Sequence, residues 1–137
     1  MKKHKFTCPS CSKTYEIKTY NTGTNDVMEL FCDYCGATLN LDLYDRRVLE
    51  LDKKYREYSK EYFAEIESIL NPCECGGRFR FDAPPRCKFC RAVVDLEEIK
   101  RQINWWGSKD GRPGLIMSRS APASKAWRKI AKRDKSA

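Results

Sequence analysis

Histidine is nearly absent from this sequence of 137 residues, since His4 is the only one. This scarcity excludes metal sites built mainly from imidazole, and it leaves a single candidate for acid–base catalysis by histidine, in a segment rich in lysine. The sequence also contains no glycine-rich phosphate loop, no nucleophile elbow and no metalloprotease helix. We therefore predict that the protein is not an enzyme.

Long apolar segments are also missing. No stretch approaches the roughly 20 apolar residues that a transmembrane helix needs. The first residues, from Met1 to Phe6, carry charges with no apolar run behind them, so they do not resemble a secretory leader. We expect a cytoplasmic protein in a reducing compartment, with no membrane partner.

Cysteine, in contrast, is abundant, and the eight residues form four close pairs: Cys8/Cys11, Cys32/Cys35, Cys73/Cys75 and Cys87/Cys90. A tight turn can aim two thiolates at one ion, and a second pair completes the tetrahedron that zinc prefers. Pairing in chain order predicts two structural Zn²⁺ sites, one from Cys8, Cys11, Cys32 and Cys35 and the other from Cys73, Cys75, Cys87 and Cys90. Short loops favour this order, although the spacing leaves an exchange of ligands between the sites open.

Two other uses of cysteine fit the sequence less well. A disulfide framework suits a secreted domain, but the sequence shows no leader. A redox dithiol occurs singly at a helix start in a βαβ unit, whereas these pairs come in matched sets with β-rich sequence between them. Four thiolates also close the zinc coordination sphere and leave no position for an activated water, which again argues against catalysis.

Two segments resemble zinc ribbons, a class of zinc finger. The first combines Phe6-Thr7-Cys8-Pro9-Ser10-Cys11 with Leu30-Phe31-Cys32-Asp33-Tyr34-Cys35-Gly36. The second is more compact and combines Cys73-Glu74-Cys75-Gly76-Gly77 with Arg86-Cys87-Lys88-Phe89-Cys90. The resemblance implies a metal-bound scaffold of short antiparallel strands. It implies no particular activity, because zinc ribbons serve in transcription, translation, nucleases and protein contacts.

The hydrophobic pattern predicts a small, metal-stabilised α+β fold. Alternating residues at 14–19, 27–31 and 38–43 predict one three-stranded ribbon sheet. Apolar residues recur every three or four positions from Asp45 to Leu70, which predicts one long helix that ends at Asn71-Pro72. We therefore predict a first zinc ribbon at 1–44, a connecting long helix at 45–71, a second ribbon with a short helix at 72–106, and a basic, partly flexible tail at 107–137.

The predicted long helix allows two interpretations. It can pack between the two ribbons as a shared spine, which is how an amphipathic helix usually buries its apolar face. Alternatively, Tyr55, Tyr58 and Tyr62 form a protein interface that meets a second copy, giving a homodimer, or meets another protein.

Positive charge is concentrated at the C-terminal end. Residues 1–106 carry 18 basic and 17 acidic side chains, whereas residues 107–137 carry 9 basic and 2 acidic ones. Such a segment can follow phosphates, and an aromatic ring within it can stack on a base. The candidate nucleic-acid contacts are Arg78, Arg80, Arg86, Lys88 and Arg91 in the second ribbon, and Lys125, Trp127, Arg128, Lys129, Lys132 and Arg133 in the tail, where residues 124–133 can form a short basic helix.

Two functions follow from the sequence. The first is a non-catalytic binding protein with two zinc ribbons, which contacts nucleic acid through the second ribbon and the tail. The alternative is a protein-interaction module, such as an inhibitor, an immunity protein or an adaptor, which binds a protein partner through the helix and the ribbon surface.

Overall fold

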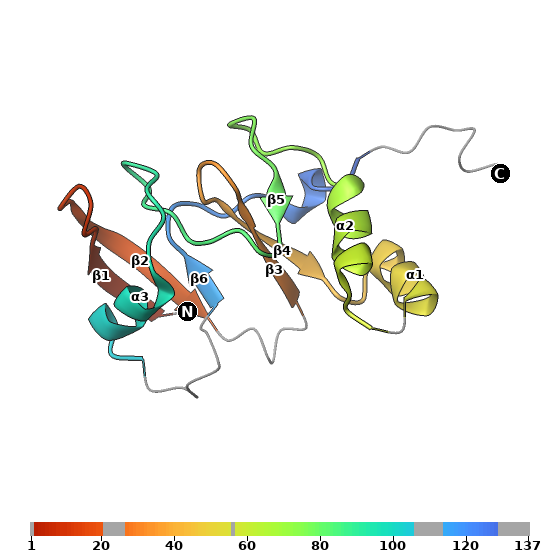
Figure 1. Ribbon diagram of the computed structural model, residues 1–137, viewed down its shortest axis with the longest axis horizontal. Helices are drawn as coiled ribbons and strands as arrows, with labels where there is room; N and C mark the ends of the chain where they lie inside the picture. The colour runs from red at the N-terminus through yellow and green to blue at the C-terminus, as the bar shows by residue number, and fades with distance from the viewer. Residues whose placement is uncertain (1, 21–26, 56, 106–113, 129–137) are drawn as a thin grey trace.

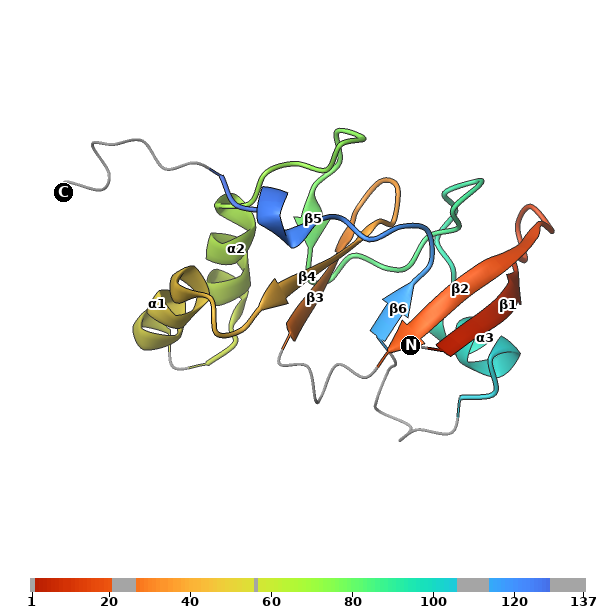
Figure 2. The same cartoon turned by 180° about the vertical axis from the view of Figure 1, so that it is seen from behind.

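A computed structural model describes residues 2–20, 27–55, 57–105 and 114–128, and it shows a small α+β fold (Figures 1 and 2). Within these residues, two antiparallel sheets of three strands lie side by side, in the orders β1-β2-β6 and β4-β3-β5. The elements are β1 (Lys2–Thr7), β2 (Thr14–Tyr20), β3 (Val27–Cys32), β4 (Thr38–Asp42), α1 (Arg46–Lys54), α2 (Lys60–Ser68), β5 (Phe79–Arg80), α3 (Leu96–Gln102), β6 (Gly114–Ile116) and the 3₁₀ turn η1 (Ala123–Lys125).

The first sheet is built on the β1–β2 hairpin, in which Phe6 lies opposite Tyr15. Alternation along β2 buries Tyr15, Ile17 and Thr19, which confirms the predicted strand. The other edge of β2 pairs with β6, where Thr19 lies opposite Leu115. The third strand of this sheet therefore comes from the segment predicted to be a basic, partly flexible tail.

The second sheet has β3 at its centre, with Leu30 opposite Leu39 of β4 and Phe31 opposite Arg80 of β5. The prediction of one sheet from residues 14–43 is therefore wrong, because β2 belongs to the first sheet and β3 and β4 to the second. Each hairpin takes its third strand from a distant part of the chain, and each sheet buries its own apolar face.

The predicted single long helix is also wrong, since α1 ends at Lys54 and α2 begins at Lys60. The side chain of Ser59 caps α2 by accepting a hydrogen bond of 3.2 Å from the backbone N–H of Tyr62. Lys54 and Glu65 form an ion pair of 2.8 Å between the two helices. The chain reversal allows both helices to pack at the same end of the molecule, beside β4 (Figure 1).

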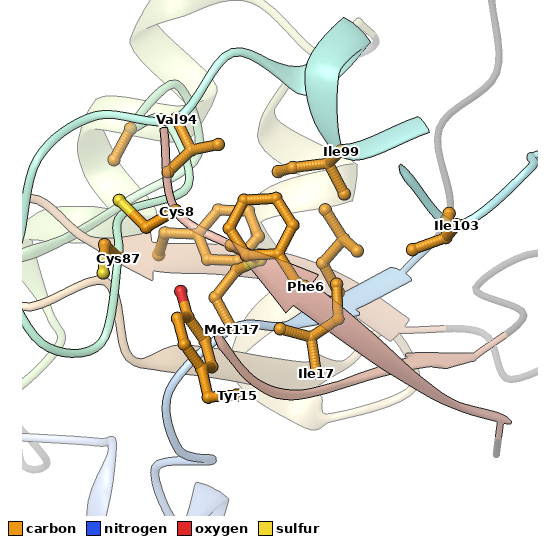
Figure 3. Packing of buried hydrophobic residues seen from close by; sticks show 12 residues of the cluster. Phe6, Cys8, Tyr15, Ile17, Cys87, Val94, Ile99, Ile103 and Met117 are labelled. Carbon is orange, nitrogen blue, oxygen red and sulfur yellow. The ribbon is translucent and has the colours of Figure 1, made fainter. Parts of the chain in front are cut away.

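Two apolar clusters stabilise the fold. In the first, Phe6 and Ile17 of the first sheet pack against Ile99 of α3 and Met117, with Cys8 and Cys87 at the edge of the cluster (Figure 3). In the second cluster, one face of the second sheet packs against α2 and the C-terminal segment. Its largest buried side chains are Leu30, Leu39, Leu41, Tyr62 and Ile66.

The helix α3, which the sequence predicted after Asp95, is confirmed, and it is fixed to β1 by one side chain. Gln102 accepts a hydrogen bond from the backbone N–H of Thr7 through Oε1 and donates one to the carbonyl of Thr7 through Nε2, both at 2.8 Å. No helix of the described residues is both long enough and apolar enough to span a membrane.

The C-terminal segment 114–128 forms a strand of the first sheet and then hydrogen-bonds to the second sheet. After β6, the backbone of Thr38 donates to the carbonyl of Arg119 at 2.9 Å and accepts from the N–H of Ala121 at 2.7 Å. The N–H of Asn71 then donates to the carbonyl of Ala126 at 2.7 Å. The predicted basic helix at 124–133 is wrong for the part that is described, because only the short 3₁₀ turn forms there; residues 129–133 lie outside the described residues.

Candidate metal centres

The four cysteine pairs lie on four loops, which we call knuckles, along one edge of the molecule (Figures 1 and 2). The first knuckle joins β1 to β2 and the second joins β3 to β4. The third precedes β5, and the fourth lies between β5 and α3. None of the eight cysteines forms a disulfide, and all eight lie in the described part of the chain.

The sulfur atoms gather into two clusters of four, each with its four sulfurs within 4.8 Å of one another. The outer cluster consists of Cys8, Cys11, Cys87 and Cys90, with sulfur–sulfur distances of 3.7 Å for Cys8–Cys90 and 3.8 Å for Cys11–Cys87. The inner cluster consists of Cys32, Cys35, Cys73 and Cys75, with 3.5 Å for Cys32–Cys75 and 3.6 Å for Cys35–Cys73. A tetrahedral Zn²⁺ with bonds of about 2.3 Å places its sulfurs about 3.8 Å apart, so both donor sets fit this ion.

The grouping of the cysteines into two sets of four is confirmed, but the sequential pairing is wrong. The first knuckle joins the fourth, and the second joins the third. Packing explains this arrangement, because Phe6 and Cys8 share a buried cluster with Cys87 and Ile99, while Cys32 lies opposite Phe79 in the second sheet. Loop-closure entropy grows only slowly with loop length, so the preference for short loops yields to this packing.

The three Cys-x-x-Cys knuckles share one backbone geometry. The N–H of the first cysteine donates to the carbonyl five residues later, and its own carbonyl accepts from the residue four positions later. That residue has a positive φ in all three loops, namely 65° at Ser12, 76° at Gly36 and 61° at Arg91. Only Gly36 is the residue type that usually marks this conformation, so two of the three turns carry little signal in the sequence.

The shorter Cys73-x-Cys75 knuckle is the same loop with one residue fewer. The N–H of Cys73 donates to the carbonyl of Gly77, and the N–H of Gly76 donates to the carbonyl of Cys73, both at 2.8 Å. Gly76 has a φ of 95°, and a Cβ at Gly77 would lie 2.6 Å from the sulfur of Cys32. The Gly76-Gly77 pair is therefore what allows this short spacing to bring both sulfurs to the cluster.

Backbone N–H groups point at the sulfurs of both clusters. The N–H of Ser10 lies 3.3 Å from the sulfur of Cys8, that of Phe89 lies 3.3 Å from Cys87, and that of Gly77 lies 3.4 Å from Cys75. Burial raises the pKa of Cys87, but hydrogen bonds from backbone N–H groups and from Tyr15 outweigh it and bring this pKa down to about 6. A thiolate is thus available at neutral pH for a metal ion.

Arg119 contacts the inner cluster, and this contact was not predicted from the sequence. Its Nη2 donates to the sulfur of Cys73 at 2.9 Å and lies 3.9 Å from the sulfur of Cys35. Four thiolates and one Zn²⁺ together carry a charge of about −2, so this guanidinium offsets part of it. A lone arginine between two serines gives no sign of this role.

A surface of cations and aromatic rings lies at the knuckle tips, and we call it the knuckle surface: Lys13, Tyr34, Lys88, Phe89 and Arg91. The side chains of Tyr34 and Phe89 are 53% and 48% exposed. Lys13 Nζ lies 4.8 Å from the ring centre of Phe89, and the Arg91 guanidinium lies 4.5 Å from that of Tyr34. Lys88 and Arg91 are among the predicted nucleic-acid contacts. The prediction did not include Lys13, Tyr34 or Phe89, although each aromatic residue precedes the second cysteine of its knuckle.

The other predicted cations of the second ribbon are placed differently. Arg78 is exposed, and its backbone N–H donates to Asp33 at 2.9 Å. The Arg80 side chain lies between carboxylates, at 3.3 Å from Asp82 and 3.9 Å from Glu67. Arg86 is half-buried and donates to the carbonyl of Arg91 at 2.8 Å.

The predicted residues of the tail do not join the knuckle surface. Trp127 packs in the second apolar cluster, and the Arg47 guanidinium lies 4.2 Å from its ring centre, so the predicted availability of this ring for a base is not observed. Lys125 and Arg128 are exposed beside the end of α2. Lys129, Lys132 and Arg133 lie outside the described residues.

The three tyrosines predicted as one interface do not form an exposed stripe. Tyr62 is fully buried, and its hydroxyl donates to Asp52 at 2.8 Å. Tyr55 is half-buried, and Tyr58 is 66% exposed. The prediction is wrong for Tyr62, because the turn between α1 and α2 directs this ring into the core.

Comparison with known proteins gives one match. A family model described as a domain of unknown function (DUF8255) matches residues 4–95, a segment that contains all eight cysteines and ends before the C-terminal segment 114–128. No curated protein and no solved structure matches the chain.

Proposed function

We propose that this chain, which belongs to the DUF8255 family, is a non-catalytic protein that holds two structural Zn²⁺ ions in ribbon-like knuckles and binds nucleic acid through its knuckle surface. One observation carries the proposal. At the tips of the knuckles, the exposed ring of Phe89 lies beside Lys13 and Lys88, and the exposed ring of Tyr34 lies beside Arg91.

The donor chemistry supports zinc in a structural role. Zinc takes four thiolates in closed sites, and such a set leaves no coordination position for water or substrate. The knuckle N–H groups stabilise charge on the sulfurs, as in sites that retain their metal. Each ion would replace the apolar core that a loop of this size cannot build, and would stabilise the fold by about 10 kcal/mol or more.

The charge pattern supports a polyanionic ligand. Among the described residues, none of Lys13, Lys88 and Arg91 forms an ion pair with a carboxylate, in contrast to Arg80. Each of the three lies instead over an aromatic ring, at 4.5 to 5.8 Å from the ring centre. Cations of this kind bind phosphates by releasing counterions, and aromatic rings beside them can contact bases or sugars.

Salt dependence tests the proposal. The affinity of the purified zinc-loaded protein for a fluorescently labelled oligonucleotide is measured by anisotropy at several salt concentrations. We expect a steep loss of affinity with rising salt, and for Lys88→Gln a slope of log K against log[salt] that is shallower by about 0.7 to 0.9.

The matched control is Lys53→Gln, because Lys53 is an exposed lysine on α1, away from the knuckles. This variant should bind as the wild type does. Absent binding, salt-independent binding, or an equal loss in both variants would contradict the proposal.

A protein-interaction module is the second candidate, and it rests on exposed apolar side chains at the other end of the molecule. Tyr44, just before α1, is 67% exposed, Leu49 of α1 is 40% exposed, and Tyr58, just before α2, is 66% exposed. A homodimer that forms through one long helix is not proposed again, because α1 and α2 are two separate helices. Under this second function, Tyr58→Ala would abolish binding of a protein partner or a copy in native mass spectrometry, and Lys88→Gln would have no effect.

A further inference from the structure

We infer that the knuckle surface binds unpaired bases, so that single-stranded nucleic acid is its class of ligand. The inference rests on the proposed function and adds the form of nucleic acid that the surface recognises. Its basis is the placement of Tyr34 and Phe89 at loop tips, where a flat base can approach each ring.

The backbone below each ring is fixed by a metal cluster. Tyr34 lies between Cys32 and Cys35, and its N–H points at the sulfur of Cys32 at 3.4 Å. Phe89 lies between Cys87 and Cys90, and its N–H points at the sulfur of Cys87 at 3.3 Å. Neither loop has to become ordered when a ligand binds, so little conformational entropy is lost.

Each ring has a protein neighbour on one side and at least one cation near it, and part of its surface is exposed. The edge of Phe89 packs on Tyr15 at 5.3 Å between ring centres, with an angle of 81° between the ring planes. The Cβ of Tyr34 lies close to Gly77, where an added Cβ would be 2.9 Å from it. About half of each side chain is nevertheless exposed. Supported rings with free surface are suited to stack on bases, which all present a π-face.

The cations lie next to the two rings, where the sugar–phosphate backbone of a strand with stacked bases would pass. Lys13 lies by Phe89. Arg91, which follows Cys90 of the outer cluster, lies by Tyr34, which precedes Cys35 of the inner cluster. The two rings therefore belong to different metal clusters, with Arg91 connecting them. A short single strand can place one base at each ring and its phosphates on these cations.

None of the described helices is placed to read a duplex at this edge. A helix that reads a duplex lies in the major groove. The helices α1 and α2 lie at the other end of the molecule, and α3 has seven residues, with Glu97 and Glu98 in its first turn. Aromatic loop tips instead match the way in which unpaired bases are recognised, by stacking.

The test compares a labelled single strand of about 12 nucleotides with the same strand annealed to its complement, at fixed salt. We expect tighter binding of the single strand. Phe89→Ala and Tyr34→Ala should each weaken this binding by about 5- to 150-fold, the range for one stacked base. Phe89→Leu, which keeps apolar contact with Tyr15 but removes the ring, should show the same loss.

Two controls accompany these variants. Tyr44→Ala removes an exposed tyrosine that lies beside α1, and it should bind as the wild type does. Native mass spectrometry of each variant should show two zinc ions, so that a loss of binding is not a loss of the knuckle.

The outcomes separate the inference from the proposed function. Equal affinity for strand and duplex, with a loss in Lys88→Gln but none in Phe89→Leu or Tyr34→Ala, would overturn the inference and leave nucleic-acid binding in place. No binding of either probe by the zinc-loaded wild type would overturn both.

Discussion

The guanidinium of Arg119 donates a hydrogen bond of 2.9 Å to the sulfur of Cys73. The same side chain also lies 3.9 Å from a carboxylate oxygen of Glu74, inside the third knuckle. Its backbone carbonyl accepts from Thr38 at the start of β4. The C-terminal segment thus links the inner cluster to the second sheet, although it lies beyond the part of the chain that the family model matches.

Replacing Arg119 should weaken the hold of the inner cluster on zinc. In Arg119→Ala, the four thiolates lose the guanidinium that donates to Cys73, and we expect zinc affinity to fall by about 10- to 100-fold, as for other residues that support metal ligands. Zinc release to a chromophoric chelator measures this. Arg46→Ala, at an exposed arginine of α1, is the matched control, and equal release from the two variants would show that Arg119 has no such role.

Pairs of substitutions can distinguish the observed ligand sets from the sequential ones. Cys8→Ser with Cys90→Ser removes two ligands of one cluster, so native mass spectrometry after mild chelation should still find one zinc ion. Cys8→Ser with Cys32→Ser damages both clusters and should leave none. The reverse result would support pairing in chain order.

Tyr62 should make stability depend on pH in the alkaline range. Burial, and then the carboxylate of Asp52, raise the pKa of Tyr62 above its ordinary value of 10.0. Above about pH 10, the unfolded chain loses this proton while the folded protein keeps it, so the free energy of unfolding falls as pH rises.

Tyr62→Phe should remove this part of the pH dependence and cost about 1 to 3 kcal/mol at neutral pH, because the hydrogen bond to Asp52 is lost. Urea unfolding in excess zinc at several pH values measures both effects. Tyr44→Phe, at an exposed tyrosine, should change neither, and an identical pH profile for Tyr62→Phe and the wild type would contradict the prediction.

Two truncations should show which part of the C-terminal end stabilises the fold. A chain that ends at Arg128 loses four basic residues and one acidic residue and keeps every described contact of the segment, so its Tm should match that of the wild type. A chain that ends at Ser118 loses Arg119 and the packing of Ala126 and Trp127. Its Tm should fall by about 5 to 15 °C, because each kcal/mol is worth several degrees in a domain of this size. Equal melting temperatures in calorimetry would show that the segment does not stabilise the fold.

Local features of the fold were accessible from the sequence. The eight clustered cysteines follow from their close pairing, with three pairs at Cys-x-x-Cys spacing and one at Cys-x-Cys spacing, and β2 follows from the alternation of Tyr15, Ile17 and Thr19. The glycines after Cys75 are likewise a local feature, and they allow a pair with one intervening residue to reach the cluster. In each case the information lies within a few neighbouring residues.

Features that depend on distant contacts were not accessible in this way. Spacing shows which sulfurs can share an ion but not which knuckles meet, and the packing of Phe6 against Ile99 decides that. The periodicity from Val48 to Ile69 runs through the turn between α1 and α2, because the rings of Tyr55 and Tyr62 face each other across the turn, with 6.1 Å between their centres. Arg119 lies 46 residues from Cys73, beyond the reach of any local pattern.

In the sequence, both cysteine pairs of the inner cluster lie between the two pairs of the outer cluster. The two clusters therefore receive their last ligand at different times during synthesis. The inner cluster has all its ligands once Cys75 has been synthesised, whereas the outer cluster waits for Cys90, which is 15 residues later. At about 5 to 20 residues per second, this interval lasts roughly 1 to 3 seconds. On a growing chain, the ligands of the inner site are therefore all present before those of the outer site.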